Sequence, residues 1–411
     1  MNVESEFERL RERLAGFAKG FNERKKEGAG VAPGRGGPRV LGSAYWSIKD
    51  LLTRDVTREG MRDLIDRETR ETYRFLTRHI DFVQLSARPW YTRYPGMVWL
   101  VFLSLAYRLS PPRRVAFALA IFALLFGLLK SLPTAAGSAA NTGLLWWLIG
   151  SALLFFLLLL ELRDKLDLKG DLEIAREIQF GLVPGGPFQL GGFGIHCFMR
   201  PANTVGGDYY DIIELGGCRV AVVVGDVAGK GMPAALLMAL LQGSLRTLIT
   251  AGFRGAEVVG KLNDYLYASI PDNSLVTLFY GELDTAGGTL RYVNAGHNAP
   301  FLMRSAGSCD RLPATATVLG FQPGLAFNTA ETTVGAGERL LLFTDGVTEA
   351  FNTSEEEYGE RRLEAYLDAQ RSLGPDPLIQ GLVRDVLSFC GAGRPRDDIT
   401  LVAVDRAAPA A

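Results

Sequence analysis

The sequence predicts an α+β sandwich in its C-terminal half, and three observations carry this prediction. From residue 193 onward, short apolar runs alternate with glycine and aspartate, a pattern typical of strands separated by turns. Several of these runs follow one another closely enough to pair as hairpins. Stretches with helical spacing are grouped between them, whereas a parallel doubly wound sheet would alternate strand and helix one for one.

The individual elements follow from local patterns. The clearest strands are expected at 219–226, 274–284, 288–296, 338–346 and 397–405, where β-branched and other apolar residues dominate. Helices are expected at 232–251, 256–269 and 377–390. Pro233 suits the first turn of a helix, because its missing N–H would have no partner there.

Composition limits the possible classes of protein. A chain of 411 residues can hold two or three domains, and a formal net charge of −1 offers no general case for binding nucleic acid. The four cysteines lack CxxC spacing, so neither a disulfide framework nor a zinc site is expected, and a reducing compartment fits better. The charged, amphipathic start is not a secretory signal.

The middle of the chain, residues 96–160, reads as a membrane region with about two transmembrane helices. Residues 115–129 and 143–160 carry no charge, and the second stretch has the 18 residues needed to span a bilayer. Basic residues flank the outer ends of the pair, which predicts that both ends face the cytoplasm. Residues 96–107 are too short to span and are expected either at the interface or as a re-entrant segment. The alternative is a pair of buried core helices.

Two helical segments border this region. Residues 1–95 are expected to be a cytoplasmic helical region, whose charged block at 48–82 forms either a solvated face or a docking surface. Residues 161–186 are expected to form a linker helix, interrupted by Gly170 and ended by Pro184. The linker either transmits a signal through dimer packing or is a plain spacer. Its apolar positions recur at helical spacing: Leu162, Leu166, Ile174, Ile178 and Leu182.

Residues 222–235, "VVVGDVAGKGMPAA", superficially resemble a phosphate-binding loop. That loop needs four residues between its first glycine and its Gly-Lys pair, followed by serine or threonine. Gly225 is one residue too close to Gly229 and Lys230, and Gly231 stands where the hydroxyl should be. The nucleotide interpretation therefore fails, and Asp226 needs another explanation.

Carboxylates recur where the predicted strands end. An aspartate beside an apolar strand is costly to bury unless it is paired or bound to a metal, although an isolated one is ordinarily a turn former. The chain has only three histidines, none spaced for zinc, so a carboxylate set favours Mg²⁺ or Mn²⁺. Two such ions about 3.5–4 Å apart suit phosphate-ester hydrolysis. The acidic set comprises Asp208, Asp211, Asp226, Asp345, Glu349, Asp397 and Asp398.

Five ordered segments resemble a known family. They are "RPANTVGGDYYD", "VVGDVAGKGMPAALLMA", "YVNAGHNAPFL", "LLLFTDGVTEA" and "RDDITLVAV", within residues 171–406. Together they are similar to the PPM-type (type-2C-like) serine/threonine phosphatases of the bacterial RsbU/SpoIIE branch. The resemblance implies an α-β-β-α four-layer sandwich at 187–411, two Mn²⁺ or Mg²⁺ ions, and a phosphorylated protein as substrate. The segment "LEIAREIQFGLVP" resembles the regulatory, dimerising helix that precedes such domains.

The resemblance also assigns roles to residues. It implies that Asp226 bridges both metals and that the Val227 carbonyl adds a ligand. Asp345 and Asp397 would hold the first metal, and Asp208 would act near the second through water. The glycines after Asp226 would let the backbone approach a metal.

Other positions are less certain. Asp398 is expected to support the ligands, with a one-residue ambiguity against Asp397. Animal-type members carry a histidine as proposed general acid where this chain has Ala228. His297 is a candidate for that role or a structural turn histidine. Arg200 and Lys230 are weak candidates for phosphate binding.

The resulting expectation is a bacterial phosphatase anchored in the inner membrane by several passes, with a cytoplasmic catalytic domain. Water would attack phosphorus directly, since no cysteine or nucleophilic serine motif accompanies the carboxylates. The substrate in this branch is usually an anti-sigma-factor antagonist, and a homodimer through the linker is expected. The alternative is a catalytically silent partner-binding module or sensor.

Overall fold

The computed structural model describes residues 106–107, 109–131, 140–271, 274–391 and 395–407. The predictions for residues 1–95 and for most of the apolar stretch at 96–107 lie outside these ranges. The described residues divide between Leu154 and Phe155 into two compact units, which are considered separately.

The first unit holds two apolar helices, α6 (Pro111–Ser131) and the start of α7 (Ala140–Leu182). At 1.5 Å per residue, the 21 residues of α6 extend for about 31 Å. That length matches a bilayer core of about 30 Å. Both helices are long and apolar enough to cross a membrane.

Small residues let α6 approach α7. A Cβ built on Gly127 would lie 2.9 Å from Cδ1 of Trp147, and one on Gly150 would lie 2.7 Å from Cγ of Leu124. The Ser131 hydroxyl donates to the Gly127 carbonyl at 2.7 Å, so it adds no unsatisfied polar group. Close packing through small residues is typical of helix pairs in membranes.

Helix α7 is continuous over 43 residues, so the prediction that Gly170 interrupts it was wrong. A glycine inside a helix costs only about 1 kcal/mol relative to alanine. The helical residues on both sides of Gly170 outweigh that cost. The helix ends at Leu182, just before Val183 and Pro184, where proline disfavours helical geometry in the residue before it.

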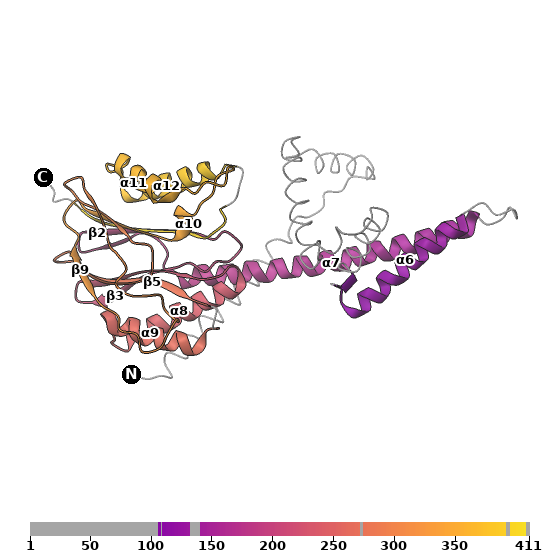
Figure 1. Cartoon of the computed structure of the whole chain (residues 1–411), viewed down its shortest axis with the longest axis horizontal. Coiled ribbons are helices and arrows are strands. Elements are labelled where there is room, and N and C mark those ends of the chain that lie inside the picture. Colours follow the sequence, from indigo (N-terminus) through magenta and orange to yellow (C-terminus); the bar gives the residue numbers. More distant parts are fainter. Residues whose placement is uncertain (1–105, 108, 132–139, 272–273, 392–394, 408–411) are drawn as a thin grey trace, which may run out of the picture. The chain divides into compact units, whose positions relative to one another are not determined.

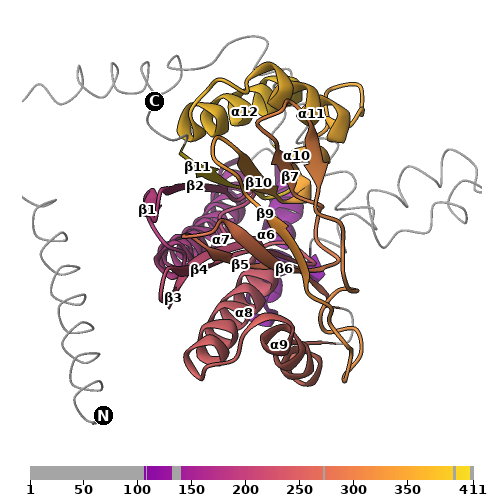
Figure 2. The same cartoon turned by 90° about the vertical axis from the view of Figure 1, so that its left-hand side faces the viewer.

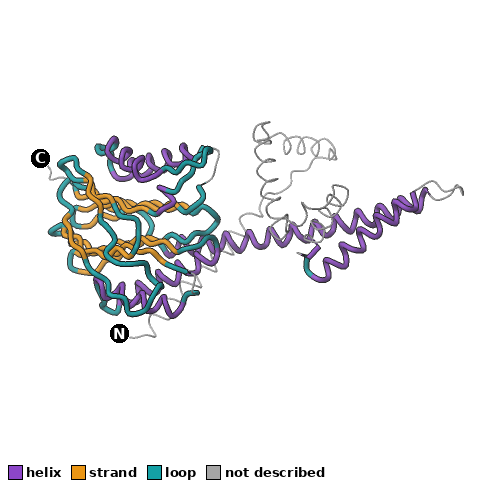
Figure 3. The backbone as a smooth tube through the Cα atoms, in the orientation of Figure 1, coloured by secondary structure: helices purple, strands orange, loops and turns teal. Residues whose placement is uncertain are grey.

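The second unit is a four-layer α-β-β-α sandwich (Figures 1 and 2). One sheet has the order β3-β4-β5-β6-β9, and the other has the order β1-β2-β11-β10-β7-β8. All pairings between neighbouring strands are antiparallel. Figure 3 shows the two sheets stacked between helical layers. The predicted fold class is therefore confirmed.

The first sheet is built from β3 (Tyr209–Gly216), β4 (Arg219–Val227), β5 (Val276–Asp284), β6 (Thr289–Ala295) and β9 (Ala330–Thr333). Its outer face is covered by α8 (Met232–Thr250) and α9 (Gly255–Ser269). The second sheet is built from β1 (Phe188–Leu190), β2 (Phe193–Arg200), β7 (Phe301–Met303), β8 (Cys309–Arg311), β10 (Arg339–Phe343) and β11 (Ile399–Arg406). On its side lie α10 (Asp345–Thr348), α11 (Gly359–Ala369) and α12 (Pro375–Cys390).

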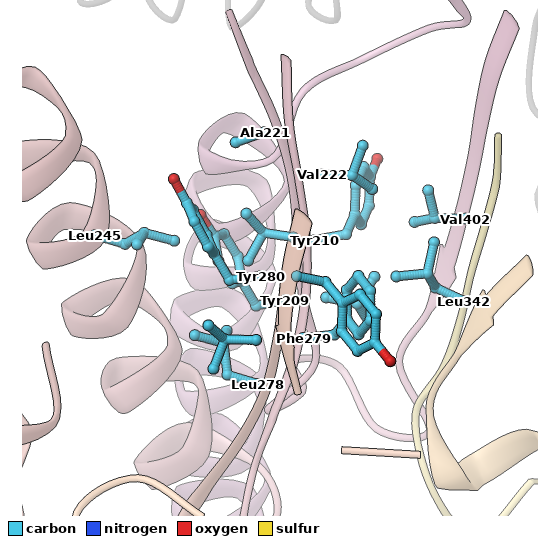
Figure 4. Close-up of a cluster of buried hydrophobic side chains, with 14 of the residues drawn as sticks. Tyr209, Tyr210, Ala221, Val222, Leu245, Leu278, Phe279, Tyr280, Leu342 and Val402 are labelled. Atoms are coloured by element: carbon cyan, nitrogen blue, oxygen red, sulfur yellow. The ribbon is translucent and has the colours of Figure 1, made fainter. Parts of the chain in front are cut away.

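Successive side chains along the strands point to opposite faces of the sheets, and they form two separate hydrophobic cores. Leu340 and Leu342 of β10 belong to the core shared with the first sheet, whereas Leu341 and Phe343 pack in the core under α11 and α12. Figure 4 shows the same alternation in β5: Leu278 and Tyr280 lie on the side of Leu245, and Phe279 lies on the side of Leu342 and Val402. Since both faces are buried, these strands read as continuous apolar runs.

The predicted strands and helices in this unit are present within a few residues of their expected bounds. Helix α8 is apolar enough to cross a membrane by composition. Its buried residues, including Met238, Leu241 and Leu245, instead belong to the core of the sandwich. The elements β1, β2, β3, β7, β8, β9, α10 and α11 were not predicted individually. Five of them (β1, β7, β8, β9 and α10) have only three or four residues, which carry no readable periodicity.

Candidate metal centre

Four strand ends meet at one end of the sandwich and carry the predicted carboxylates. Asp208 directly precedes β3, and Asp226 is the penultimate residue of β4, the antiparallel neighbour of β3. Asp345 begins α10 two residues after the end of β10, and Asp397 lies two residues before β11, which pairs with β10. Antiparallel pairing places the start of one strand beside the end of its neighbour, which explains this gathering.

The electrostatics of the group are those of crowded anions. The pKa of Asp226 is raised to about 7, chiefly by burial and next by the negative charges of Asp345, Asp397 and Asp398. Burial also raises the pKa of Asp345 to about 6, with Glu349 and Asp397 adding repulsion. Mutual effects of this kind require the carboxylates to be near one another.

Asp208 is the most deeply buried member. Burial raises the pKa of its carboxyl well above the ordinary value, followed by repulsion from Asp226 and Asp398. Its Oδ2 accepts a hydrogen bond from the Thr344 hydroxyl at 2.8 Å. The same hydroxyl accepts from the Thr400 N–H at 3.0 Å, so Thr344 joins β3, β10 and β11 at this point. Sequence reasoning missed Thr344, although it directly precedes Asp345 in "FTDG".

Asp397 and Asp398 differ in what their oxygens contact. Both oxygens of Asp398 accept backbone N–H groups at 2.7 Å, from Ala202 and from Gly207. Asp397 Oδ2 instead lies 2.7 Å from the Lys230 ammonium, which also donates to the Arg396 carbonyl at 2.6 Å. Asp398 therefore holds the loop before β3, whereas Asp397 contacts the Lys230 ammonium.

Three glycines make the packing around Asp398 and the Val227 carbonyl possible. A Cβ on Gly207 would lie 2.6 Å from the Val227 carbonyl oxygen, and Cβ atoms on Gly206 and Gly346 would collide with Asp398. At Gly229 and Gly231, after Asp226, no atom lies within 4 Å of a built Cβ. Their φ angles of 118° and 72° show that they serve the turn. The close contacts between protein atoms therefore occur at Gly206, Gly207 and Gly346, and the expected approach of the backbone after Asp226 to a metal stays a prediction.

The weaker candidates lie in different surroundings. The Arg200 side chain is exposed at the end of β2 and has no partner among the described residues. His297 is buried, its Nδ1 lies 2.9 Å from the Thr277 hydroxyl, and its N–H donates to Asn294 Oδ1 at 2.8 Å. Burial lowers its pKa to about 4, so the ring is neutral at physiological pH. These contacts fit the structural alternative for His297.

Asp211 does not join the carboxylate group. It lies on β3 and is fully buried, with both oxygens bound at 2.7 Å by the Arg246 guanidinium of α8. The Tyr209 hydroxyl donates to the same carboxylate at 2.7 Å. Asp211 therefore fastens α8 to the sheet.

The end of α7 is attached to the loop that precedes Asp208. Gln179 donates from Nε2 to the Gly206 carbonyl at 2.7 Å and accepts from the Gly206 N–H at 3.2 Å. The Tyr210 hydroxyl donates to the Pro184 carbonyl at 2.9 Å. Sequence reasoning used only the apolar positions of this helix, so it missed Gln179.

The donor set fits a hard divalent cation, because it consists of carboxylates that repel one another and a nearby carbonyl. Within the described residues, however, no three acidic, histidine or cysteine side chains are drawn together as a finished cation site. The Lys230 ammonium lies against Asp397, and it also lowers the pKa of Asp226 and Asp345. Lys230 thus supplies part of the charge that a cation would provide.

Comparison with known proteins agrees with this architecture. Residues 216–407 match the family described as Stage II sporulation protein E (SpoIIE). The chain carries a SpoIIE-type, PP2C-like serine phosphatase domain. The resemblance seen in the sequence is thereby confirmed. Asp208 and Arg200 lie before the matched segment. Domains of this type are typically metal-dependent.

The matches to individual relatives span only part of this chain and part of each relative. Protein IcfG of Synechocystis sp. is 30% identical over 273 residues, which are 60% of this chain and 43% of that protein. Phosphoserine phosphatase RsbU of Bacillus subtilis is 27% identical over 184 residues, which are 44% of this chain and 55% of that protein. The chain therefore spans about half the length of the curated relatives it matches.

Among solved structures, the SiaA-PP2C domain of Pseudomonas aeruginosa superposes with a TM-score of 0.51 at 20% identity. The match covers 58% of this chain and 97% of that domain. This likeness shows the shared fold.

Proposed function

We propose that the domain is a metal-dependent protein phosphatase that hydrolyses phosphoserine or phosphothreonine on a signalling protein. The observation that carries the proposal is the gathering of Asp208, Asp226, Asp345 and Asp397 at one end of two facing sheets. The repulsion among these carboxylates, seen in the raised pKa of Asp226, would be relieved by bound cations, and Lys230 relieves only part of it.

Two divalent cations would be held by Asp226, Asp345, Asp397, the Val227 carbonyl and, through water, Asp208. When bound, such ions would neutralise the phosphoryl oxygens and acidify the water that attacks phosphorus. The chain itself orients the ligands: Thr344 holds Asp208, and Asp398 holds the Gly207 N–H beside the Val227 carbonyl. Lys230 contacts Oδ2 of Asp397, and its half-exposed side chain would move aside if that oxygen were to coordinate a cation.

The substrate we propose is a phosphorylated protein of a partner-switching pathway, an anti-sigma-factor antagonist. Support comes from the family and from the similarity to RsbU, whose name describes a phosphoserine phosphatase. The net charge of −1 gives no reason to add a nucleic acid as partner.

We also propose that α6 and the start of α7 anchor the chain in the inner membrane, with the phosphatase domain in the cytoplasm. The length and composition of the helices support anchoring, and the flanking basic residues support the orientation. Exposed apolar residues continue along α7 as Leu162, Leu166, Ile174 and Ile178. A second copy of α7 would cover them in a homodimer. Replacing Ile174 and Ile178 with glutamate should then yield monomers in light-scattering measurements.

A catalytically silent binding module is the alternative. It is favoured by the contact between Lys230 and Asp397, which leaves the carboxylates short of a finished cation site in the described structure. Such a module would bind the phosphorylated protein without turnover.

Hydrolysis of a phosphoserine peptide by the fragment 171–411 separates the two functions. Turnover is expected with Mn²⁺ or Mg²⁺, and it should disappear with chelator and in Asp226→Ala. Folded wild-type fragment that is inactive with both metals would refute the enzymatic proposal and favour the binding module.

A further inference from the structure

A groove of about 740 Å³ opens beside the carboxylate group. One wall is a single face of α7, formed by Lys169, Leu172, Glu173 and Arg176. Their spacing of three, four and seven residues places these side chains on the same side of the helix. The facing wall is the loop from Arg200 to Val205, and Gly231, Met232 and Pro395 complete the lining.

The facing wall is made from the segments that hold the site carboxylates. The Ala202 N–H donates to Asp398 Oδ1 at 2.7 Å. Gly231 follows Lys230, which contacts Asp397 at 2.7 Å. Pro395 precedes Arg396, whose carbonyl accepts from Lys230 at 2.6 Å. A chain lying in the groove would therefore pass directly beside the reaction centre.

The charge of the groove is positive. It contains Lys169, Arg176 and Arg200 against the single carboxylate of Glu173. All three cationic side chains are exposed, and none has an acidic partner among the described residues. The Arg176 guanidinium lies over the Phe180 ring at 5.4 Å, which orients it without neutralising it. An excess of unpaired positive charge on both walls attracts an acidic ligand.

We infer that this groove binds an acidic segment flanking the phosphorylated residue of the protein substrate. The α7 helix is then part of the substrate-binding surface rather than only a connection. This inference rests on the proposed function for the identity of the ligand, but the positive groove itself does not depend on turnover.

The test compares two phosphoserine peptides that differ only in their flanks, four acidic residues in one and the corresponding amides in the other. The full chain is purified in detergent micelles with Mn²⁺, and kcat/KM is measured for both peptides. Wild-type protein is expected to prefer the acidic peptide. In the double variant Lys169→Glu, Arg176→Glu this preference should fall by tenfold or more, through KM, and the loss should be smaller in high salt.

Arg163→Glu is the matched control, because Arg163 lies on the same helix and pairs with Asp167 outside the groove. It should retain the wild-type preference. An unchanged preference in the double variant, or an equal loss in the control, would overturn the inference.

Binding is measured in parallel by fluorescence anisotropy of the labelled acidic peptide in the presence of chelator, where no turnover occurs. Binding that is weakened tenfold in the double variant supports the groove even if the chain hydrolyses neither peptide. Hydrolysis of both peptides without any preference refutes the groove and leaves the phosphatase proposal standing.

Discussion

Removing the Arg246 guanidinium tests how the site-bearing sheet is fastened to its covering helix. Arg246 of α8 binds both oxygens of Asp211 at 2.7 Å, and the Asp211 side chain is completely buried. Arg246→Ala would leave that carboxylate with only the Tyr209 hydroxyl and the Ile212 N–H as donors. A buried charge that loses its partner is strongly destabilising.

The decrease in the free energy of unfolding expected for Arg246→Ala can be estimated from comparable buried ion pairs. Breaking a buried ion pair from one side costs about 3–5 kcal/mol. The Arg246 side chain is 43% exposed, so water can enter the vacated space, and two donors remain. Both facts favour the lower end, about 3 kcal/mol. For a domain of 150–250 residues, this corresponds to a melting temperature lower by about 6–12 °C.

The assay is thermal unfolding of the fragment 171–411, with Arg291→Ala as control. Arg291 also forms a pair, with Glu331 at 2.8 Å, but both side chains are exposed. Its removal should leave the melting temperature within error of wild type. Adding Asp211→Asn to Arg246→Ala should recover part of the loss, because the stranded charge disappears. An Arg246→Ala fragment as stable as the control would refute this reasoning.

Three further predictions concern the carboxylates directly. Lys230→Met removes the ammonium 2.7 Å from Asp397, so calorimetry should show Mn²⁺ binding about two- to fivefold tighter. Gly207→Ala places a methyl group 2.6 Å from the Val227 carbonyl, so Mn²⁺ affinity should fall tenfold or more. Gly243→Ala, in open space on α8, should leave affinity unchanged. In chelator, Asp226→Asn should raise the melting temperature at pH 8 and have little effect at pH 4.

The pH prediction follows from the raised pKa of Asp226, about 7 against an ordinary 3.8. The folded state holds this proton more tightly than the unfolded state, so the charge destabilises the fold above pH 7 and costs nothing below about pH 4. An effect of Asp226→Asn that is equal at both pH values would contradict this assignment. Weaker Mn²⁺ binding in Lys230→Met would make Lys230 a helper of the metal rather than its competitor. Equal Mn²⁺ affinity in the Gly207 and Gly243 variants would remove the Val227 carbonyl from the site.

The parts of the fold that could be predicted are those with a local signature. The apolar run from 219 to 226 ends in Gly-Asp, and in the structure its side chains are buried on both faces of the sheet. Both the strand β4 and the position of Asp226 at its end could therefore be predicted. The same holds for β10 with Asp345 and β11 with Asp397. Their gathering followed from the resemblance and from the number of carboxylates at strand ends, because spacing alone left turn aspartates as an alternative.

The parts that could not be predicted depend on contacts between distant residues. Gly207 and Asp398 are 191 positions apart, and no local pattern announces that a carboxylate fills the space beside a glycine. Asp211 looked like a site carboxylate until the Arg246 guanidinium, 35 residues away, was found against it. Gly170 was wrongly read as a break, because an isolated glycine in a long helix is overridden by its helical neighbours.

Calorimetric titration of the metal-free fragment 171–411 with Mn²⁺ tests the central claim most directly, namely that the carboxylates at this end of the sandwich form a two-cation centre. The account predicts two ions per chain in the wild-type fragment, and one or none in Asp226→Ala, which should remain folded. Absence of Mn²⁺ and Mg²⁺ binding by the folded wild-type fragment, or equal binding by Asp226→Ala, would contradict the claim.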